Sequence, residues 1–528
     1  MGNQLLASKV VIVEEEPRIR NVPALPTAVV GAVGITERGP VGQAVLVTSF
    51  EEFVDTFGGF TANSDLSLAA SAFFENGGQT LWVVRTVHYT DPTAATTKTS
   101  AAAAFTLVDR SPTPAPTLKV AGKWDGAYAN DVTIVIGPPT SRAAGEFNLT
   151  VEDNGLITEV FPNLSMAPTK PSYVETIINH PGNGSRLIAV TALSSTTAAP
   201  NNLPAIGTFG PLAAGSDGLA GLTDADFVGS DAGKTGLHAL DTVQQLSVLI
   251  VPGRATAAVH GAMVSYCEVT RDRGCFAILD PPANQSATDI ITYAESTAAI
   301  LGLTEFAALY WPRVKVLNPS TAVFGNAANL IVPPSGHIAG VYSRVDSSRP
   351  GGVFIPPAGI ENGQLLGVIG FETDEVLSET KRDLVFPKRI NPLTVFPGAP
   401  RHIDGARTLK GDGNFPTVAE RRGVIFIEQS LKLGLLFAKH HNNTEALRAT
   451  LARTVTAFLL IQLKNGAFAS SNPKQAFFVD FGDALNPPSV ILSGQVVGRI
   501  GLATAKPAEF IVLRFSQDTR ALDASLAG

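Results

Sequence analysis

The sequence is poor in cysteine, with only two in 528 residues. Cys267 and Cys275 are too few to frame a chain of this length with disulfides. No histidine or further thiol accompanies them at the spacing of a metal site. We therefore expect two buried, reduced thiols in a protein that folds in a reducing cytoplasm.

Charge is also scarce, at 16% of residues, and the net charge is −7 with no basic block. Proteins that neutralise phosphates carry clustered Lys and Arg, so nucleic acid is not an expected partner. The sequence has no run of 18 apolar residues, and its N-terminus lacks the pattern of a secretion signal. We expect no direct insertion into a membrane.

A chain of this length needs three or four hydrophobic cores. Residues 22–87 and 236–385 alternate strand and helix patterns, which predicts a mainly parallel sheet covered by helices. The expected strands are 28–34, 80–87, 246–251, 275–279, 306–310 and 314–317. The expected helices are 50–57, 65–76, 236–245, 260–271 and 289–301.

Between these two segments the composition changes. Residues 90–104 are rich in Thr and Ala and read as a linker, and residues 105–213 are rich in strand and turn patterns. The strand candidates here are 118–121, 132–136, 147–152 and 186–191. The sequence predicts a β-rich domain inserted into the α/β core, projecting outward from it.

The C-terminal part predicts a compact α+β unit. A helical run ends at Ala438, and Thr444 is placed to cap a second helix through its hydroxyl. Apolar residues at helical spacing give the second helix one buried face, and Asn465-Gly466 ends it. These residues are Leu447, Leu451, Val455, Phe458 and Leu459. Strands are expected at 476–481, 495–502 and 509–515.

This C-terminal order of elements resembles that of contractile tail sheath proteins. The residues that carry the resemblance are Asp404-Gly-Ala-Arg-Thr-Leu409, Glu420-Arg-Arg422, Phe426-Ile-Glu428, Asn465-Gly-Ala467, Ala476-Phe-Phe-Val479, Asn486-Pro-Pro488 and Lys506-Pro-Ala-Glu-Phe-Ile511. Upstream segments resemble the same family, among them Phe73-Phe-Glu-Asn-Gly-Gly78, Trp82-Val-Val-Arg85, Ser247-Val-Leu-Ile-Val-Pro-Gly253 and Ala277-Ile-Leu-Asp-Pro-Pro282.

The resemblance implies a multidomain α/β and α+β fold with exchanged terminal strands. Its expected divisions are an N-terminal linking arm at 1–20, the first part of the core at 21–90, the inserted β-rich outer domain with its linkers at 91–235, the second part of the core at 236–385, the C-terminal assembly domain at 386–515 and a tail at 516–528.

The function implied is structural. Sheath subunits polymerise as stacked hexameric rings around an inner tube, and contraction drives the tube through a target envelope. The implied partners are other copies of the chain, the inner tail tube protein, and the baseplate and tail terminator proteins. Such a subunit is assembled in the bacterial cytoplasm and becomes part of a phage tail or an injection particle. The alternatives are a hydrolase-like α/β enzyme with an inserted β-domain, or an assembly protein that does not contract.

Two sets of residues are expected to make contacts between chains. The residues expected to exchange strands with neighbouring subunits are Val10, Val11, Ile12, Val13, Phe510, Ile511, Val512, Leu513 and Phe515. Those expected to face the tube are Lys432, Lys439, His440 and His441.

Several motifs could be mistaken for sites of chemistry. Gly229–Thr235 has one residue too few for a phosphate-binding loop and follows no strand pattern. Asp217, Asp224 and Asp226 lack the spacing of a calcium loop, and Asp224 is placed to cap a helix. Asp280 follows an apolar strand, and His337 and Asp346 could join it, but the sequence supplies no nucleophile motif. The adjacent His440 and His441 would point apart. We expect no enzyme activity, cofactor or metal.

Overall fold

The largest sheet of the protein has eight strands. The computed structural model describes residues 21–193, 195–373 and 377–513. The strand order is β18-β17-β13-β12-β11-β1-β3-β2, and the six strands from β17 to β3 are parallel, with an antiparallel strand at each edge. This confirms the predicted mainly parallel sheet. The strands are β1 (Val29–Gly34), β2 (Ala44–Val47), β3 (Thr80–Arg85), β11 (Val248–Ile250), β12 (Phe276–Leu279), β13 (Ala307–Trp311), β17 (Ile390–Thr394) and β18 (His402–Ile403).

Helices pack against this sheet and bury its apolar strands in the largest core. The closest packing joins α2 to α8, where Gly336 and Gly340 allow the backbones to approach. A Cβ on Gly336 would lie 2.4 Å from the carbonyl oxygen of Ala69, so no larger residue fits there. The helices of this region are α1 (Phe50–Phe57), α2 (Leu66–Glu75), α4 (Asp224–Val228), α5 (Ala257–Ser265), α6 (Ala287–Thr292), α7 (Thr321–Phe324), α8 (Ser335–Ser347), α9 (Gly359–Asn362) and α10 (Glu379–Val385). A three-stranded antiparallel sheet lies beside them, formed by β14 (Val314–Leu317), β15 (Asn329–Val332) and β16 (Val368–Phe371).

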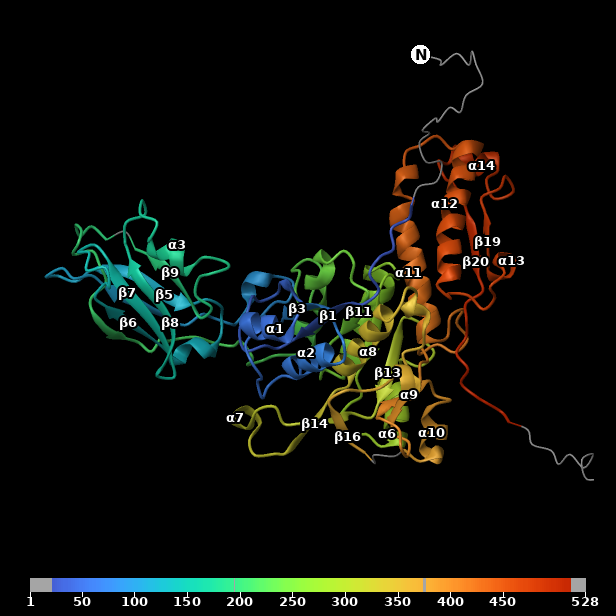
Figure 1. The fold of residues 1–528 in the computed structure, drawn as a ribbon, viewed down its shortest axis with the longest axis horizontal. Helices are drawn as coiled ribbons and strands as arrows, with labels where there is room; N and C mark the ends of the chain where they lie inside the picture. The colour runs from blue at the N-terminus through green and yellow to red at the C-terminus, as the bar shows by residue number, and fades with distance from the viewer. Residues whose placement is uncertain (1–20, 194, 374–376, 514–528) are drawn as a thin grey trace, which may run out of the picture.

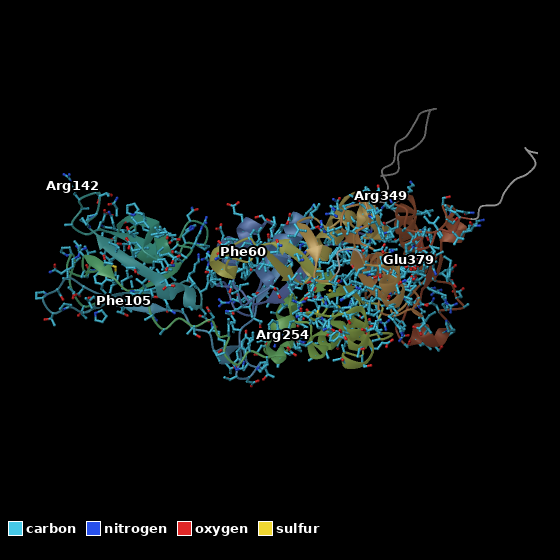
Figure 2. The ribbon with its side chains drawn as sticks, turned by 90° about the horizontal axis from the view of Figure 1, so that it is seen from below. Phe60, Phe105, Arg142, Arg254, Arg349 and Glu379 are labelled. Carbon is cyan, nitrogen blue, oxygen red and sulfur yellow. The ribbon has the colours of Figure 1, made fainter. Side chains whose placement is uncertain are left out.

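A β-rich unit with its own hydrophobic core, which runs from Ala103 to Leu212, lies at one end of the molecule (Figure 1). It contains two antiparallel sheets, ordered β10-β6-β7-β8 and β4-β5-β9. Figure 2 places Arg142 at its outer tip, far from Arg349 and Glu379. Its elements are β4 (Ala104–Val108), β5 (Pro116–Gly122), β6 (Val132–Gly137), β7 (Phe147–Asp153), β8 (Leu156–Leu164), α3 (Val174–Ile178), β9 (Ile188–Ala192) and β10 (Gly207–Phe209).

The C-terminal unit lies at the opposite end in both views (Figures 1 and 2). Two long helices pack against a short antiparallel ribbon around a third core. The Thr444 hydroxyl caps α12 by accepting from the Leu447 N–H, and Gly466 adopts the left-handed conformation after its end, both as predicted. The unit consists of α11 (Val418–Gly434), a 3₁₀ turn (Leu436–Ala438), α12 (Glu445–Lys464), α13 (Pro473–Ala476), β19 (Phe477–Asp480), α14 (Pro488–Leu492) and β20 (Arg499–Leu502).

By length and composition the 20-residue helix α12 could cross a membrane, although the sequence has no unbroken run of 18 apolar residues. Its residues Val455, Phe458 and Leu459 are buried in the third core with residues of α11 and β19, and Leu451 is buried as well. That packing is typical of a core helix in a globular protein.

Some sequence predictions differ from the structure. The helices expected at 260–271 and 289–301 each end in a π-helical turn, at Tyr266–Thr270 and Tyr293–Thr297. The segment expected as helix 236–245 is a 3₁₀ helix at Gly236–Thr242. The cap of α4 is Thr223 and not Asp224, because the buried Asp226 carboxylate accepts from the Thr223 N–H and completes a capping box. Of the strand expected at 509–515, residues 509–513 pair with no strand, and the remainder lies outside the described residues.

Candidate assembly interface

The first turn of α11 joins the C-terminal unit to α8 and to the loop before β13. Arg422 binds the Asp346 carboxylate through two N–O distances of 2.6 and 3.1 Å, and both side chains are almost completely buried. Its guanidinium also lies 4.4 Å from the centre of the Tyr342 ring. Arg421 pairs with Glu305 and Glu428 at 3.2 and 2.5 Å. A buried charge that loses its partner is very costly, so this pairing fixes α11 on the core.

The ribbon of β19 and β20 is the part of this unit best suited to accept another chain. Val479 and Leu502 are partly buried against the third core, while Phe478 is 53% exposed. Its sheet has only these two strands in the described part of the chain, so each strand has one edge with unpaired backbone groups. A two-stranded ribbon is only marginally stable alone, and added strands would stabilise it.

The first described residues lie along α11 (Figure 1). Arg422 donates to the carbonyl oxygen of Thr27, the Leu25 N–H donates to the Ser430 hydroxyl, and Val22 packs where Gly434 has no side chain. The chain therefore approaches the C-terminal end of α11 as it is followed back toward residue 21. Val10, Val11, Ile12 and Val13, expected to exchange strands, lie outside the described residues.

The last described residues begin at the same ribbon and run outward past α9 and α10 (Figure 1). The Ala503 N–H donates to the Ala476 carbonyl at 2.8 Å, and the Thr504 hydroxyl donates to the buried Glu420 carboxylate at 2.8 Å. The segment then becomes exposed. The exposed fractions are 74% for Phe510, 82% for Ile511, 77% for Val512 and 71% for Leu513. Phe515 lies outside the described residues.

The expected tube-facing residues gather around the turn between α11 and α12. Lys432, Lys439, His440 and His441 line a hollow of about 790 Å³ together with residues such as Leu436 and Phe481. Lys432 is paired with Asp272 at 2.7 Å, and both side chains are exposed. The positive charge of this surface is therefore partly neutralised by an acid from another part of the chain, which the sequence did not reveal.

In the motif that resembles a phosphate loop, Lys234 and Thr235 are engaged by other residues of the chain. Lys234 forms ion pairs with Asp231 and with Asp241, the second at 3.0 Å, and the Thr235 hydroxyl donates to the Pro92 carbonyl. The element before it is the helix α4 and not a strand. His238 joins the two aspartates closely enough to suggest a metal site, which spacing alone did not predict. Because the Lys234 ammonium already pairs with both carboxylates, the cluster is explained without a cation.

The residues considered for catalysis support the fold. The buried Asp280 carboxylate accepts from the Ser335 N–H and hydroxyl at 2.8 and 2.7 Å, and so holds the start of α8. Burial raises the pKa of Asp280 to about 6, although the bonds from Ser335 oppose the shift. Burial lowers the pKa of His337 to about 4. Asp346 is engaged by Arg422. Cys267 and Cys275 are free and buried, as predicted.

The central part of the chain matches a known protein family. Residues 230–409 match the family model described as the phage tail sheath protein central domain. The predicted resemblance to contractile tail sheath proteins is confirmed. No curated protein sequence matches the chain.

Solved sheath structures share the fold of this sheath-like chain over nearly its whole length. The sheath of the anti-feeding prophage in its contracted state is 19% identical, with a TM-score of 0.57, and the match covers 97% of this chain and 99% of that one. The sheath of an extracellular contractile injection system, PVC, is 18% identical, with a TM-score of 0.54, covering 98% and 100%. The sheath tail protein of Desulfitobacterium hafniense is 14% identical, with a TM-score of 0.54, covering 90% and 93%.

Proposed function

We propose that the chain is the structural subunit of a contractile sheath. It polymerises as stacked hexameric rings around an inner tube, and its contraction drives the tube through a target cell envelope. The observation that carries the proposal is the ribbon of β19 and β20, whose outer edges pair with no further strand in the described part of the chain and from which the C-terminal segment leaves. The match of nearly the whole chain to solved sheath proteins supports it.

In this proposal the terminal segments link neighbouring subunits. Val10–Val13 of one copy and Phe510–Phe515 of another add strands to the free edges of the ribbon in the C-terminal domain. Four consecutive exposed apolar residues at 510–513 support this assignment, because such a segment is stabilised when another chain covers it. About five backbone hydrogen bonds per junction, at about 1 kcal/mol each, would hold the link.

Linked arms allow subunits to remain connected while they change position. The pairing of Arg421 and Arg422 fixes α11 on the core, and in this proposal the arms accommodate the relative movement of neighbouring subunits. Backbone hydrogen bonds within an exchanged sheet persist while side-chain surfaces separate and pair again. The energy for contraction would then be stored in the assembled state, and the subunit would need no enzymatic activity.

The proposed linkage of subunits through the terminal arms also assigns roles to the remaining parts of the chain. The domain boundaries predicted from the sequence are proposed for the assembled subunit, with the β-rich insertion at the outer radius of the sheath. The turn at Lys439–His441 faces the tube protein, and the ends of the sheath meet the baseplate and terminator proteins. Assembly takes place in the bacterial cytoplasm.

Negative-stain electron microscopy of the purified full chain tests this function. We expect long hollow tubes of uniform diameter that sediment on ultracentrifugation. A small, discrete oligomer at all concentrations would contradict the proposal and would favour the enzyme alternative. Tubes whose diameter is the same with and without an inner tube protein would instead favour an assembly protein that does not contract.

A further inference from the structure

Two motifs that lie about a hundred residues apart in the sequence meet at the base of the C-terminal segment. Arg407, from the Asp404–Leu409 motif, binds Glu509, from the Lys506–Ile511 motif. Its Nε and one terminal nitrogen lie 3.0 and 2.6 Å from the two carboxylate oxygens. A two-pronged bond of this kind fixes direction as well as distance. The two side chains are only 15% and 25% exposed, so solvent screens the pair incompletely.

Phe386 completes this contact from the end of α10. Its carbonyl oxygen accepts from the other terminal nitrogen of Arg407 at 2.9 Å, and its ring lies 3.7 Å from the guanidinium carbon. The same ring meets the Phe510 ring edge to face, with centroids 6.3 Å apart. Arg407 is itself oriented by the Asn391 side chain, which accepts from its backbone N–H. One rigid group therefore holds two successive residues of the terminal segment.

We propose that Arg407 and Phe386 form an anchor that sets where, and in which direction, the C-terminal arm leaves the subunit. The anchor thereby selects the neighbouring subunit that the arm reaches. The inference rests on the proposed sheath function and adds positioning residues to it. The exposed residues that follow, Ile511–Leu513, are the first part of the arm free to pair with another chain.

The position of the anchor determines the reach of the arm. Upstream, the last contacts are those of Thr504 with Glu420 and of the Ala505 N–H with the Ala467 carbonyl. Without the anchor, five more residues, 506–510, would become mobile, which adds about 17 Å of extended chain. A longer and less directed tether lowers the effective concentration of the arm at one particular partner. Arms would then reach incorrect neighbours or none.

The first test addresses the anchor in unassembled subunits. Chymotrypsin can cut after Phe510 only when the segment leaves Phe386 and extends into the protease. We expect Glu509→Arg to speed this cleavage at least about fivefold, and Glu509→Gln to have a smaller effect. Lys506→Glu, which changes an exposed charge on the same segment, is the matched control and should leave the rate unchanged. Equal rates in the wild type and Glu509→Arg would overturn the proposal.

The second test addresses assembly. Glu509→Arg should reduce the sedimenting tube fraction about tenfold while leaving the melting temperature of the subunit unchanged. Adding Arg407→Glu should restore much of the tube fraction, since the opposite charges meet again, whereas loss of fold would not be restored. Faster cleavage with normal tubes, or no recovery in the double variant, would refute the positioning role. If the wild type forms no tubes, the sheath function fails, and the cleavage assay still reports on the anchor.

Discussion

Among single residues, Asp280, which follows β12 and binds the start of α8, and His337, in the first turn of α8, oppose folding in different pH ranges. Both are buried, at 3% and 2% exposed. Burial raises the pKa of Asp280 to about 6, so its ionisation costs stability as the pH rises. It lowers the pKa of His337 to about 4, so protonation costs stability as the pH falls. Between pH 4 and 6 the two changes in stability have opposite signs and partly cancel in the wild type. Substitution of one residue therefore reveals the contribution of the other.

Asp280→Asn removes the ionisable carboxylate, so comparison with the wild type gives its contribution to the pH dependence of stability. In the wild type, the unfolded chain releases this proton near pH 4 and the folded protein only near pH 6. Stability from this group is therefore present below pH 4 and lost as the pH rises to 6. We expect the variant to gain up to about 3 kcal/mol in unfolding free energy relative to the wild type between pH 4 and 7. Denaturant titrations at both pH values measure this difference.

Asp289 provides the control for this experiment. It lies in the exposed capping box of α6, where hydrogen bonds from Ser286 lower its pKa. Asp289→Asn should therefore lose stability relative to the wild type as the pH rises, which is the opposite sign. The same trend in both variants would show that the pH dependence does not come from burial of Asp280.

The turn between α11 and α12 carries the lysines expected to face the tube. If Lys432 and Lys439 contact an acidic tube surface, replacing both with Glu should weaken packaging of the tube without affecting empty sheath. Each exposed contact contributes less than about 1 kcal/mol, but repetition along the sheath adds these contributions. Co-sedimentation with purified tube protein at low salt measures the effect.

Lys432 needs its own control because it already pairs with Asp272. Asp272→Asn frees Lys432 without changing its charge and should strengthen tube packaging. Unchanged packaging in the Lys432→Glu/Lys439→Glu variant would contradict a tube-facing role for this turn.

Among helices and strands, the sequence predicted those that are determined by neighbouring residues, such as caps and periodic apolar positions. The helix α1 was predicted to the residue, and the start and end of α12 followed from Thr444 and Gly466. Strand pairing and contacts between residues far apart in the sequence were harder to predict. β8 was missed because its residues Leu156, Ile157 and Val160 are exposed on an edge strand and do not alternate cleanly. The partners of Arg407 and Arg422, Glu509 and Asp346, could not be named at all, because contacts across 102 and 76 residues depend on the completed fold.

The N-terminal segment is tested by removing residues 1–16. The described chain starts its contacts with α11 at Val22 and Leu25, so the deletion leaves those contacts intact. We expect a folded subunit with an unchanged melting temperature that no longer forms tubes, because the strand donated to its neighbour is gone. Electron microscopy and circular dichroism provide the two measurements.

A matched variant separates sequence from length in this experiment. Replacing Val10–Val13 with Gly and Ser preserves the number of residues but removes the apolar, β-prone side chains. It should fail to form tubes as the deletion does. Normal tubes from either protein would contradict strand exchange through this arm.

At the scale of the whole molecule, the β-rich unit and the ribbon occupy opposite ends (Figures 1 and 2). The unit has its own core, and polar contacts join it to α1 and to the large sheet. Arg186 pairs with Asp55 at 2.6 Å, and the buried Arg85 donates to the Asp125 carbonyl at 2.7 Å. The chain enters and leaves at adjacent points, since Ala101 and Ser216 exchange two backbone hydrogen bonds at 3.0 and 2.8 Å. A separate core with adjacent ends is the arrangement in which excision is best tolerated.

Excision of residues 102–215, with Ala101 joined to Ser216 through a short Gly/Ser linker, should therefore leave tube formation largely intact. The tubes should be narrower in outer diameter if this unit lies at the outer radius. The loss of the Asp125 carbonyl leaves a buried donor of Arg85 without its partner, which costs about 1–3 kcal/mol. The excision is thus made both with Arg85 and with Arg85→Met, so that this cost is not mistaken for a failure of assembly. Soluble, folded protein that forms no tubes in either background would place the β-rich unit within the contacts between subunits.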